Sequence, residues 1–96
     1  MTIGVFATIK AREGQEAALE AGFKELAAAV RANEPGNSLY MLVRSRKEKG
    51  TYHVMEVYES EEALNAHRGS AHMKAIGPKL GPVVAGPPAV EIFDAV

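Results

Sequence analysis

The sequence contains no cysteine, and this absence removes several kinds of chemistry at once. Disulfides, iron–sulfur clusters, thiolate zinc sites and a thiol nucleophile are all excluded. Tryptophan is also missing, and aromatic residues make up only 6% of the chain. Hydrophobic residues account for 47% and charged residues for 24%. Those two fractions are typical of a globular protein.

The chain has neither a strong charge of one sign nor a long apolar run. Its formal net charge is -1, and the dispersed Lys and Arg residues form no basic face that would bind the phosphates of a nucleic acid. No apolar run approaches the roughly 20 residues that span a bilayer, and the first residues lack the order of a signal peptide. We therefore expect a cytoplasmic protein that binds neither nucleic acid nor membrane. The 96 residues correspond to a single domain, 1–96.

The spacing of apolar residues predicts the order of helices and strands. Period-two alternation predicts strands over 2–10, 38–46, 51–59 and 89–95. Helical spacing and N-cap residues predict helices over 15–32, 61–68, and 71–76 or a little beyond. Asn33, before Glu34 and Pro35, is expected to cap the first helix in the left-handed conformation. The Gly-Pro pairs that begin at Gly77 predict no regular structure until the last strand.

This order, β-α-β-β-α-β with the second helical element broken, is typical of a ferredoxin-like α+β fold. Such a fold has an antiparallel sheet with its helices on one face. The first two strands, however, carry apolar side chains on both faces, among them Phe6 opposite Val5 and Met41 opposite Leu42. A second copy that packs its sheet against the first would cover the open face. We therefore predict a homodimer through the sheet faces.

The stretch 52–76 holds all three histidines and a carboxylate within a strand, Glu56. Histidine has an unperturbed pKa of about 6.5, which suits a general base at neutral pH. His67 projects from the same side of its helix as Leu64, and His72 follows a Gly-Ser break, so that the two rings can converge. Glu56 can orient a histidine, whereas His53 points to the opposite face.

Simpler structural roles remain open for each of these residues. His67 can be a histidine that is hydrogen-bonded between helix and sheet, and Glu56 can pair with Arg44 across the hairpin. A metal held by His67 and His72 is not favoured, because the spacing differs from the i, i+4 of zinc motifs and no third ligand can be named.

The strand-to-helix run resembles the antibiotic biosynthesis monooxygenase (ABM) family. The run consists of Glu56-Val57-Tyr58-Glu59-Ser60 followed by Ala63-Leu64, His67, Ser70 and His72. It is most similar to the quinol monooxygenase branch, in which an aromatic-Glu-Ser turn precedes a leucine and two histidines five residues apart. The Glu34-Pro35-Gly36 turn agrees with this resemblance. Tyr58 departs from it, since the family usually carries tryptophan there.

The resemblance implies a dimeric α+β barrel with a pocket between the sheet and the helices of each subunit. Family oxygenases of this type use O2 without metal, haem or flavin, so a cofactor-free oxidation of a quinol or related phenolic or polyketide aromatic is implied. A base must then take the phenolic proton, and an apolar pocket must hold the ring and O2. We expect catalytic roles for His67, His72 and Glu56. The residues expected to bind the substrate are Tyr58, Thr8, Phe23, Leu64 and Ile76.

Other functions within this fold stay open, because a fold alone does not determine chemistry. The haem-degrading branch is not expected: it relies on an asparagine, a tryptophan and a haem-ligating histidine, where this chain has Thr8, His67 and Gly77. The same histidines would also suit an isomerase or tautomerase that moves a proton on a small carbonyl compound. A third alternative is a non-catalytic dimeric protein that binds a ligand or responds to stress.

Overall fold

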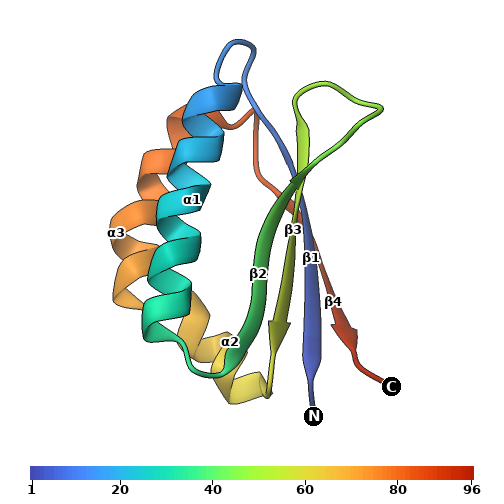
Figure 1. Cartoon of the computed structure of the whole chain (residues 1–96), viewed down its shortest axis with the longest axis vertical. Coiled ribbons are helices and arrows are strands. Elements are labelled where there is room, and N and C mark those ends of the chain that lie inside the picture. Colours follow the sequence, from blue (N-terminus) through green and yellow to red (C-terminus); the bar gives the residue numbers. More distant parts are fainter.

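An antiparallel four-stranded sheet forms one layer of the molecule, and the helices form the other (Figure 1). A computed structural model describes all residues from Met1 to Val96. The elements in chain order are β1 (Ile3–Lys10), α1 (Glu16–Asn33), β2 (Asn37–Arg44), β3 (Thr51–Tyr58), α2 (Glu61–Arg68), α3 (Ala71–Leu80), the 3-10 turn η1 (Gly81–Val83) and β4 (Ala89–Asp94). The strand order is β2-β3-β1-β4. The predicted α+β, ferredoxin-like fold is thereby confirmed.

The helix-facing side of the sheet follows from the alternation of the two central strands. Ile3, Val5, Ala7 and Ile9 of β1 are all buried. In the antiparallel register Val5 stands beside Glu56 of β3. Because side chains opposite each other in a register share a face, Glu56 also points toward the helices. A carboxylate therefore lies in the middle of an otherwise apolar surface.

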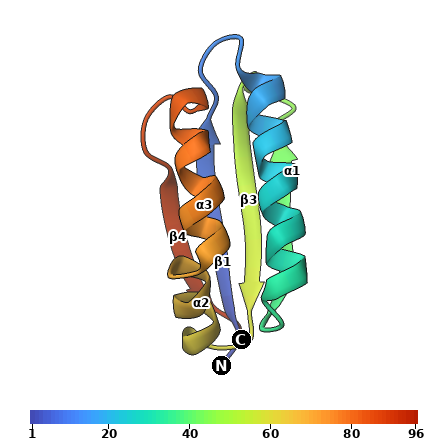
Figure 2. The same ribbon diagram turned by 90° about the vertical axis from the view of Figure 1, so that its left-hand side faces the viewer.

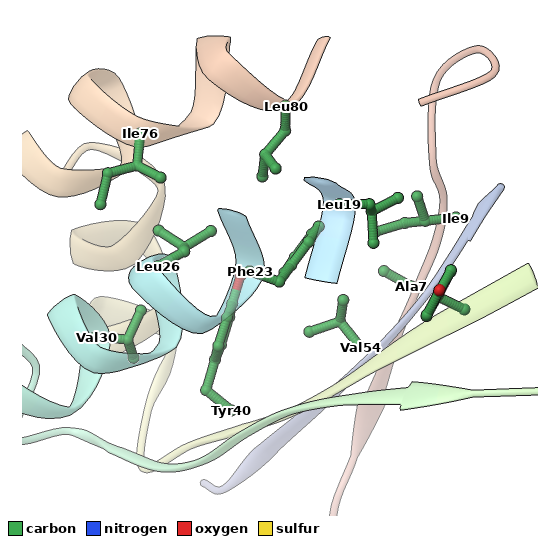
Figure 3. Close-up of a cluster of buried hydrophobic side chains, with 11 residues drawn as sticks. Ala7, Ile9, Leu19, Phe23, Leu26, Val30, Tyr40, Val54, Ile76 and Leu80 are labelled. Carbon is green, nitrogen blue, oxygen red and sulfur yellow. The ribbon is translucent and has the colours of Figure 1, made fainter. Parts of the chain in front are cut away.

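The main core lies between α1, α3 and the sheet (Figure 3). Helix α1 contributes Leu19, Phe23, Leu26 and Val30, which are spaced as one face of a helix and are all buried. Tyr40 and Val54 face them from β2 and β3, and Ile76 and Leu80 from α3. A smaller cluster under α2 consists of Ile3, Val5, Tyr58 and Leu64.

The end of α1 differs from the prediction that Asn33 takes a left-handed cap. No residue other than glycine has a positive φ in the structure. Asn33 stays helical, and its Nδ2 donates to the carbonyl of Ala29 at 2.9 Å. The helix stops instead at Glu34, whose φ of -121° and ψ of 86° are extended. The ring of Pro35 disfavours the helical conformation at the preceding residue, which agrees with the end of the helix at Glu34.

The segment after Ile76 is helical, although its Gly-Pro pairs predicted irregular structure. Helix α3 continues through Gly77 and Pro78 to Leu80. Proline lacks an N–H, and its ring clashes with the Cβ of the residue before it, but Gly77 has no Cβ. Leu80 is buried in the main core and packs beside Gly22 of α1, where an added Cβ would lie 2.5 Å from Leu80 Cδ2. This tertiary packing outweighs the weak local helix propensity.

The other side of the sheet carries no helix (Figures 1 and 2). The register places Phe6, Met55 and Met41 in one row across it, because Phe6 pairs with Met55 and Met55 pairs with Met41. Phe6 is 37% and Met41 46% exposed. No helix of the structure combines the length and hydropathy that a bilayer crossing requires.

A double-mutant cycle tests the packing that extends α3. Leu80→Ala should lower the free energy of unfolding by about 2–4 kcal/mol through the cavity it leaves. Alanine has a higher helix propensity than glycine, so Gly22→Ala should raise the free energy of unfolding by about 1 kcal/mol in the Leu80→Ala background. In the native background it should not, because the new methyl group would clash with Leu80. Urea unfolding of the four proteins measures the coupling, and strictly additive effects would contradict the proposed contact.

Candidate active site

The junction between α2 and α3 determines where His67 and His72 lie. Ser70 caps α3 by accepting from the backbone N–H of Met73 at 3.3 Å. The Ser70 hydroxyl also donates to the carbonyl of His67 at 2.8 Å, which ties the end of α2 to the start of α3. The two imidazole rings, although on different helices, come to lie with their centroids 6.4 Å apart. The predicted convergence of the two histidines is therefore seen.

A third group, the carboxylate of Glu34, lies between these rings. The turn after α1 reaches the start of α2 because Gly36 has no side chain: a Cβ there would lie 2.7 Å from that of Ala63. The carbonyl of Gly36 also accepts from the N–H of Glu59 at 2.8 Å. These contacts hold the turn against α2 and direct Glu34 toward the histidines.

The Glu34 carboxylate accepts hydrogen bonds from both rings. Nδ1 of His67 lies 2.9 Å from Oε2 and 3.1 Å from Oε1 of Glu34, and Nε2 of His72 also bonds to Oε2. The three side chains are only 6%, 9% and 11% exposed for His67, Glu34 and His72. An ionised carboxylate accepts only, so this partner assigns the proton of His67 to Nδ1. In the neutral ring, Nε2 then carries a free lone pair.

The free nitrogen of His67 faces Glu56 of β3. Nε2 lies 3.8 Å from Glu56 Oε1, too far for a direct hydrogen bond. The same oxygen accepts the Tyr58 hydroxyl at 2.6 Å. Burial raises the pKa of Glu56, and the Tyr58 hydrogen bond and the nearby His67 offset this only in part. Burial and the bond to Glu56 likewise raise the pKa of Tyr58, so its hydroxyl stays a donor.

A cavity of about 390 Å³ opens beside these two groups. His67 and Glu56 are the only ionisable lining residues apart from Tyr40. Apolar side chains of β1, α1, β3 and α3 form most of the wall, and Pro87 and Pro88 line it just before β4. Its volume lies within the range of small-molecule sites. Another hollow, of about 380 Å³, lies between α1 and β2 but contains neither His67 nor His72.

The structure brings together the three residues predicted to be catalytic. Among the residues predicted to bind a substrate, Phe23 lines the cavity. Tyr58 contacts the ring of His67 at a centroid distance of 5.3 Å but does not line the cavity. Leu64 lies in the core cluster under α2 and Ile76 in the main core, and neither lines the cavity, contrary to the prediction that they bind a substrate.

Thr8 requires a correction, because it lies on the open face of the sheet. Its hydroxyl bonds to Nδ1 of His53 at 3.1 Å. It alternates with Ala7 and Ile9, which line the cavity from the other face. The prediction that Thr8 binds a substrate between the sheet and the helices is therefore wrong. Arg44 also pairs with Glu20 of α1 at 3.0 Å, not with Glu56.

Two residues of the site escaped the sequence reasoning. The sequence identified Glu34 only as part of the Glu34-Pro35-Gly36 turn. No pattern in the neighbouring residues indicates that its carboxylate contacts two histidines. Tyr40 stands beside Glu56 in the sheet register and forms a wall of the cavity, with its ring 5.5 Å from that of His67. The alternation of β2 could have identified Tyr40, since it places Tyr40 on the helix-facing side.

The arrangement can remove a proton from a bound molecule. Nε2 of His67 lies at the edge of an apolar cavity, and Glu34 holds the opposite side of the ring. A carboxylate behind a histidine orients the ring and stabilises the imidazolium that forms when Nε2 accepts a proton. Burial raises the pKa of Glu56 and so favours its protonated form, in which the carboxyl can donate a hydrogen bond on the same wall.

Fold and site together define a two-layer α+β protein with a buried histidine beside an apolar cavity. Residues 2–79 match the family model of antibiotic biosynthesis monooxygenases. The chain belongs to this family. Among curated proteins, none matches it.

Solved structures agree with this assignment. A Caulobacter crescentus protein described as a candidate antibiotic biosynthesis monooxygenase is 47% identical, with 99% of this chain and 90% of that chain covered and a TM-score of 0.95. Rv0793 from Mycobacterium tuberculosis is 28% identical, with coverage of 100% and 96% and a TM-score of 0.89. A Nitrosomonas europaea protein of 16% identity shares the fold, with coverage of 99% and 90% and a TM-score of 0.92.

The raised pKa of Glu56 predicts a pH-dependent effect of Glu56→Gln. Because burial raises that pKa, the folded state holds the proton more tightly than the unfolded chain. Ionisation of Glu56 therefore costs stability as the pH rises through the raised value. Glutamine keeps an acceptor for Tyr58 and cannot ionise. The gain in unfolding free energy on Glu56→Gln should be larger at about pH 8 than at about pH 4. Urea denaturation measures it, and a gain independent of pH would refute the interpretation.

Proposed function

We propose that this protein is a cofactor-free monooxygenase that oxidises a quinol or a related phenolic aromatic with O2. Membership of the ABM family supports the reaction class. The observation that carries the proposal is the free Nε2 of His67 at the wall of an apolar cavity, with Nδ1 bonded to Glu34 at 2.9 Å. The cavity accommodates an aromatic ring, and Phe23 and Tyr40 supply aromatic contacts for it.

Proton removal starts the proposed reaction. His67 Nε2 accepts the phenolic proton, and the resulting imidazolium is stabilised by the Glu34 carboxylate. In its protonated form, which burial favours, the carboxyl of Glu56 donates a hydrogen bond to the phenolate oxygen and stabilises this negative charge in the apolar cavity. In this scheme His67 and Glu56 touch the substrate. His72 acts through Glu34, as a positioning residue.

The phenolate then transfers one electron to O2, and the semiquinone and superoxide combine into a hydroperoxide on the ring. Loss of water from this hydroperoxide leaves one oxygen atom on the product. For hydroquinone the balance is hydroquinone plus O2 giving hydroxybenzoquinone plus water. O2 is the only oxidant required, and the imidazolium returns its proton to the departing water. Exclusion of bulk water by the apolar walls favours these steps.

His67→Gln should lower kcat/KM for O2 uptake with hydroquinone by at least about 100-fold, the contribution of a general base. Glu34→Gln should lower kcat while KM stays nearly unchanged, because Glu34 does not line the cavity. An oxygen electrode in metal-free buffer measures both. His53→Gln is the matched control, since His53 bonds to Thr8 on the opposite face.

Labelled oxygen separates the enzymatic reaction from spontaneous autoxidation. With 18O2, the enzymatic reaction should place one labelled oxygen atom in the quinone. Autoxidation instead yields hydrogen peroxide, which is detected because added catalase converts it back to O2. Unchanged uptake in His67→Gln, or no uptake with any of a broad panel of phenols, would refute the proposal.

An isomerase is the second candidate, and the short distance between His67 and Glu56 favours it. Nε2 of His67 lies 3.8 Å from Oε1 of Glu56, so that one group could accept a proton from one atom of a substrate while the other donates a proton to a second atom. Such an enzyme would introduce solvent deuterium into a small keto compound without O2 uptake. That result would replace the monooxygenase assignment.

We also propose that two copies of the chain pack through their open sheet faces into a dimeric α+β barrel. The row Phe6, Met55 and Met41 lies on this face, together with His53, whose ring stacks on Phe6 at 4.8 Å. Apolar side chains at the centre of a sheet need a cover, and the helices occupy only the other face (Figure 1).

Phe6→Glu should convert the proposed dimer into monomers, because it puts a charge into the centre of the buried face. Sedimentation velocity should give the mass of two chains for the native protein and of one chain for the variant. Ala28→Glu is the control, since Ala28 is exposed on α1. A native protein that sediments as one chain at micromolar concentration would contradict the proposal.

A further inference from the structure

We propose that Glu34, His67 and His72 form a binding site for a divalent transition metal of the zinc type, and that the bound ion switches the enzyme off. One ligand atom of each residue lies within 4.8 Å of the others. The inhibitory part of this inference rests on the function proposed above, whereas the binding part does not.

The donor set selects the class of metal. Two imidazole nitrogens and one carboxylate oxygen suit Zn²⁺ and its neighbours among first-row metals, whereas Mg²⁺ and Ca²⁺ prefer oxygen ligands alone. Nδ1 of His67 and Nε2 of His72 both hydrogen-bond to Oε2 of Glu34. An ion would replace the protons that now join these atoms, and a small outward shift of the rings would give the metal–ligand distances of about 2.0–2.2 Å.

The three ligands are also supported from behind. Ser70 joins the two helices that carry the histidines through its bond to the His67 carbonyl at 2.8 Å. Gly36 holds the turn that carries Glu34 close to Ala63 of α2. Because these contacts already hold the three side chains in place, less conformational entropy is lost when an ion binds.

An ion can reach this site without passing through the substrate cavity. His72 lines a surface hollow of about 530 Å³ together with Asn33 and Ser70. Glu34 and His72 line a second groove of about 340 Å³. Neither hollow shares a lining residue with the cavity beside Glu56. Water from this side can occupy the remaining coordination position.

Metal binding and base function compete for the same ring. A neutral imidazole carries one N–H, so when Nδ1 of His67 binds a metal the proton must move to Nε2. Nε2 then points at the substrate as a donor and can no longer accept the phenolic proton. Occupancy of the site should therefore block the reaction rather than promote it.

Zinc binding is tested on chelator-treated, dialysed full-length protein. Isothermal calorimetry with ZnCl2 should show one ion per chain, and Co²⁺ should give a visible absorption band that Zn²⁺ removes. His72→Ala should weaken binding at least about tenfold, as loss of even an outer partner of a metal site does. His53→Ala should bind like the native protein, because His53 lies on the other sheet face. Circular dichroism checks that each variant is folded.

No zinc binding by the native protein, or equal affinity in native protein and a folded His72→Ala variant, would overturn the metal site. In the activity measurement, O2 uptake should fall in proportion to the fraction of chains that hold zinc. Uptake that rises with Zn²⁺ or Fe²⁺ would overturn the inhibitory role. If no phenol supports uptake, the proposed function fails, while calorimetry and the Co²⁺ band still decide the metal site.

Discussion

The carboxylate of Glu34, shared by His67 and His72, is the interaction on which the site depends. It joins the turn after α1 to the junction of α2 and α3, two segments that no backbone pairing connects at this point. Burial of a carboxylate is costly unless donors surround it, and here two ring nitrogens do so. Because a carboxylate accepts only, it also orients His67 with Nε2 toward the cavity, so one contact secures both the packing and the orientation of the ring.

Strand β3 contributes side chains to both faces of the sheet. Val54 and Glu56 belong to the helix side and line the cavity, whereas His53 and Met55 belong to the open face. The alternation of a β-strand makes this division unavoidable, since neighbouring side chains point to opposite faces. A change of register by one residue would exchange the two sets and would destroy cavity and open face together.

Much of the fold was predictable because its local signals agree with its packing. Helical spacing predicted α1, in which Leu19, Phe23 and Leu26 lie four and three residues apart and are buried. An N-cap residue predicted the start of α2, and Ser60 takes this position before two glutamates. The errors fall where the signals disagree. Gly77 and Pro78 oppose a helix locally, but burial of Leu80 stabilises one. Thr8 was assigned to the substrate although alternation with Ala7 places it on the other face.

The sequence alone determined the order of the elements and the lack of any thiol chemistry, and it indicated that His67 and His72 can converge, because these follow from composition and from spacing along one short stretch. Only the tertiary structure decided that Glu34 is their partner and which nitrogen of His67 is free. Glu34 is 33 residues from His67 and 38 from His72. Contacts of that range depend on where whole helices and strands come to pack, which local propensity and periodicity do not encode.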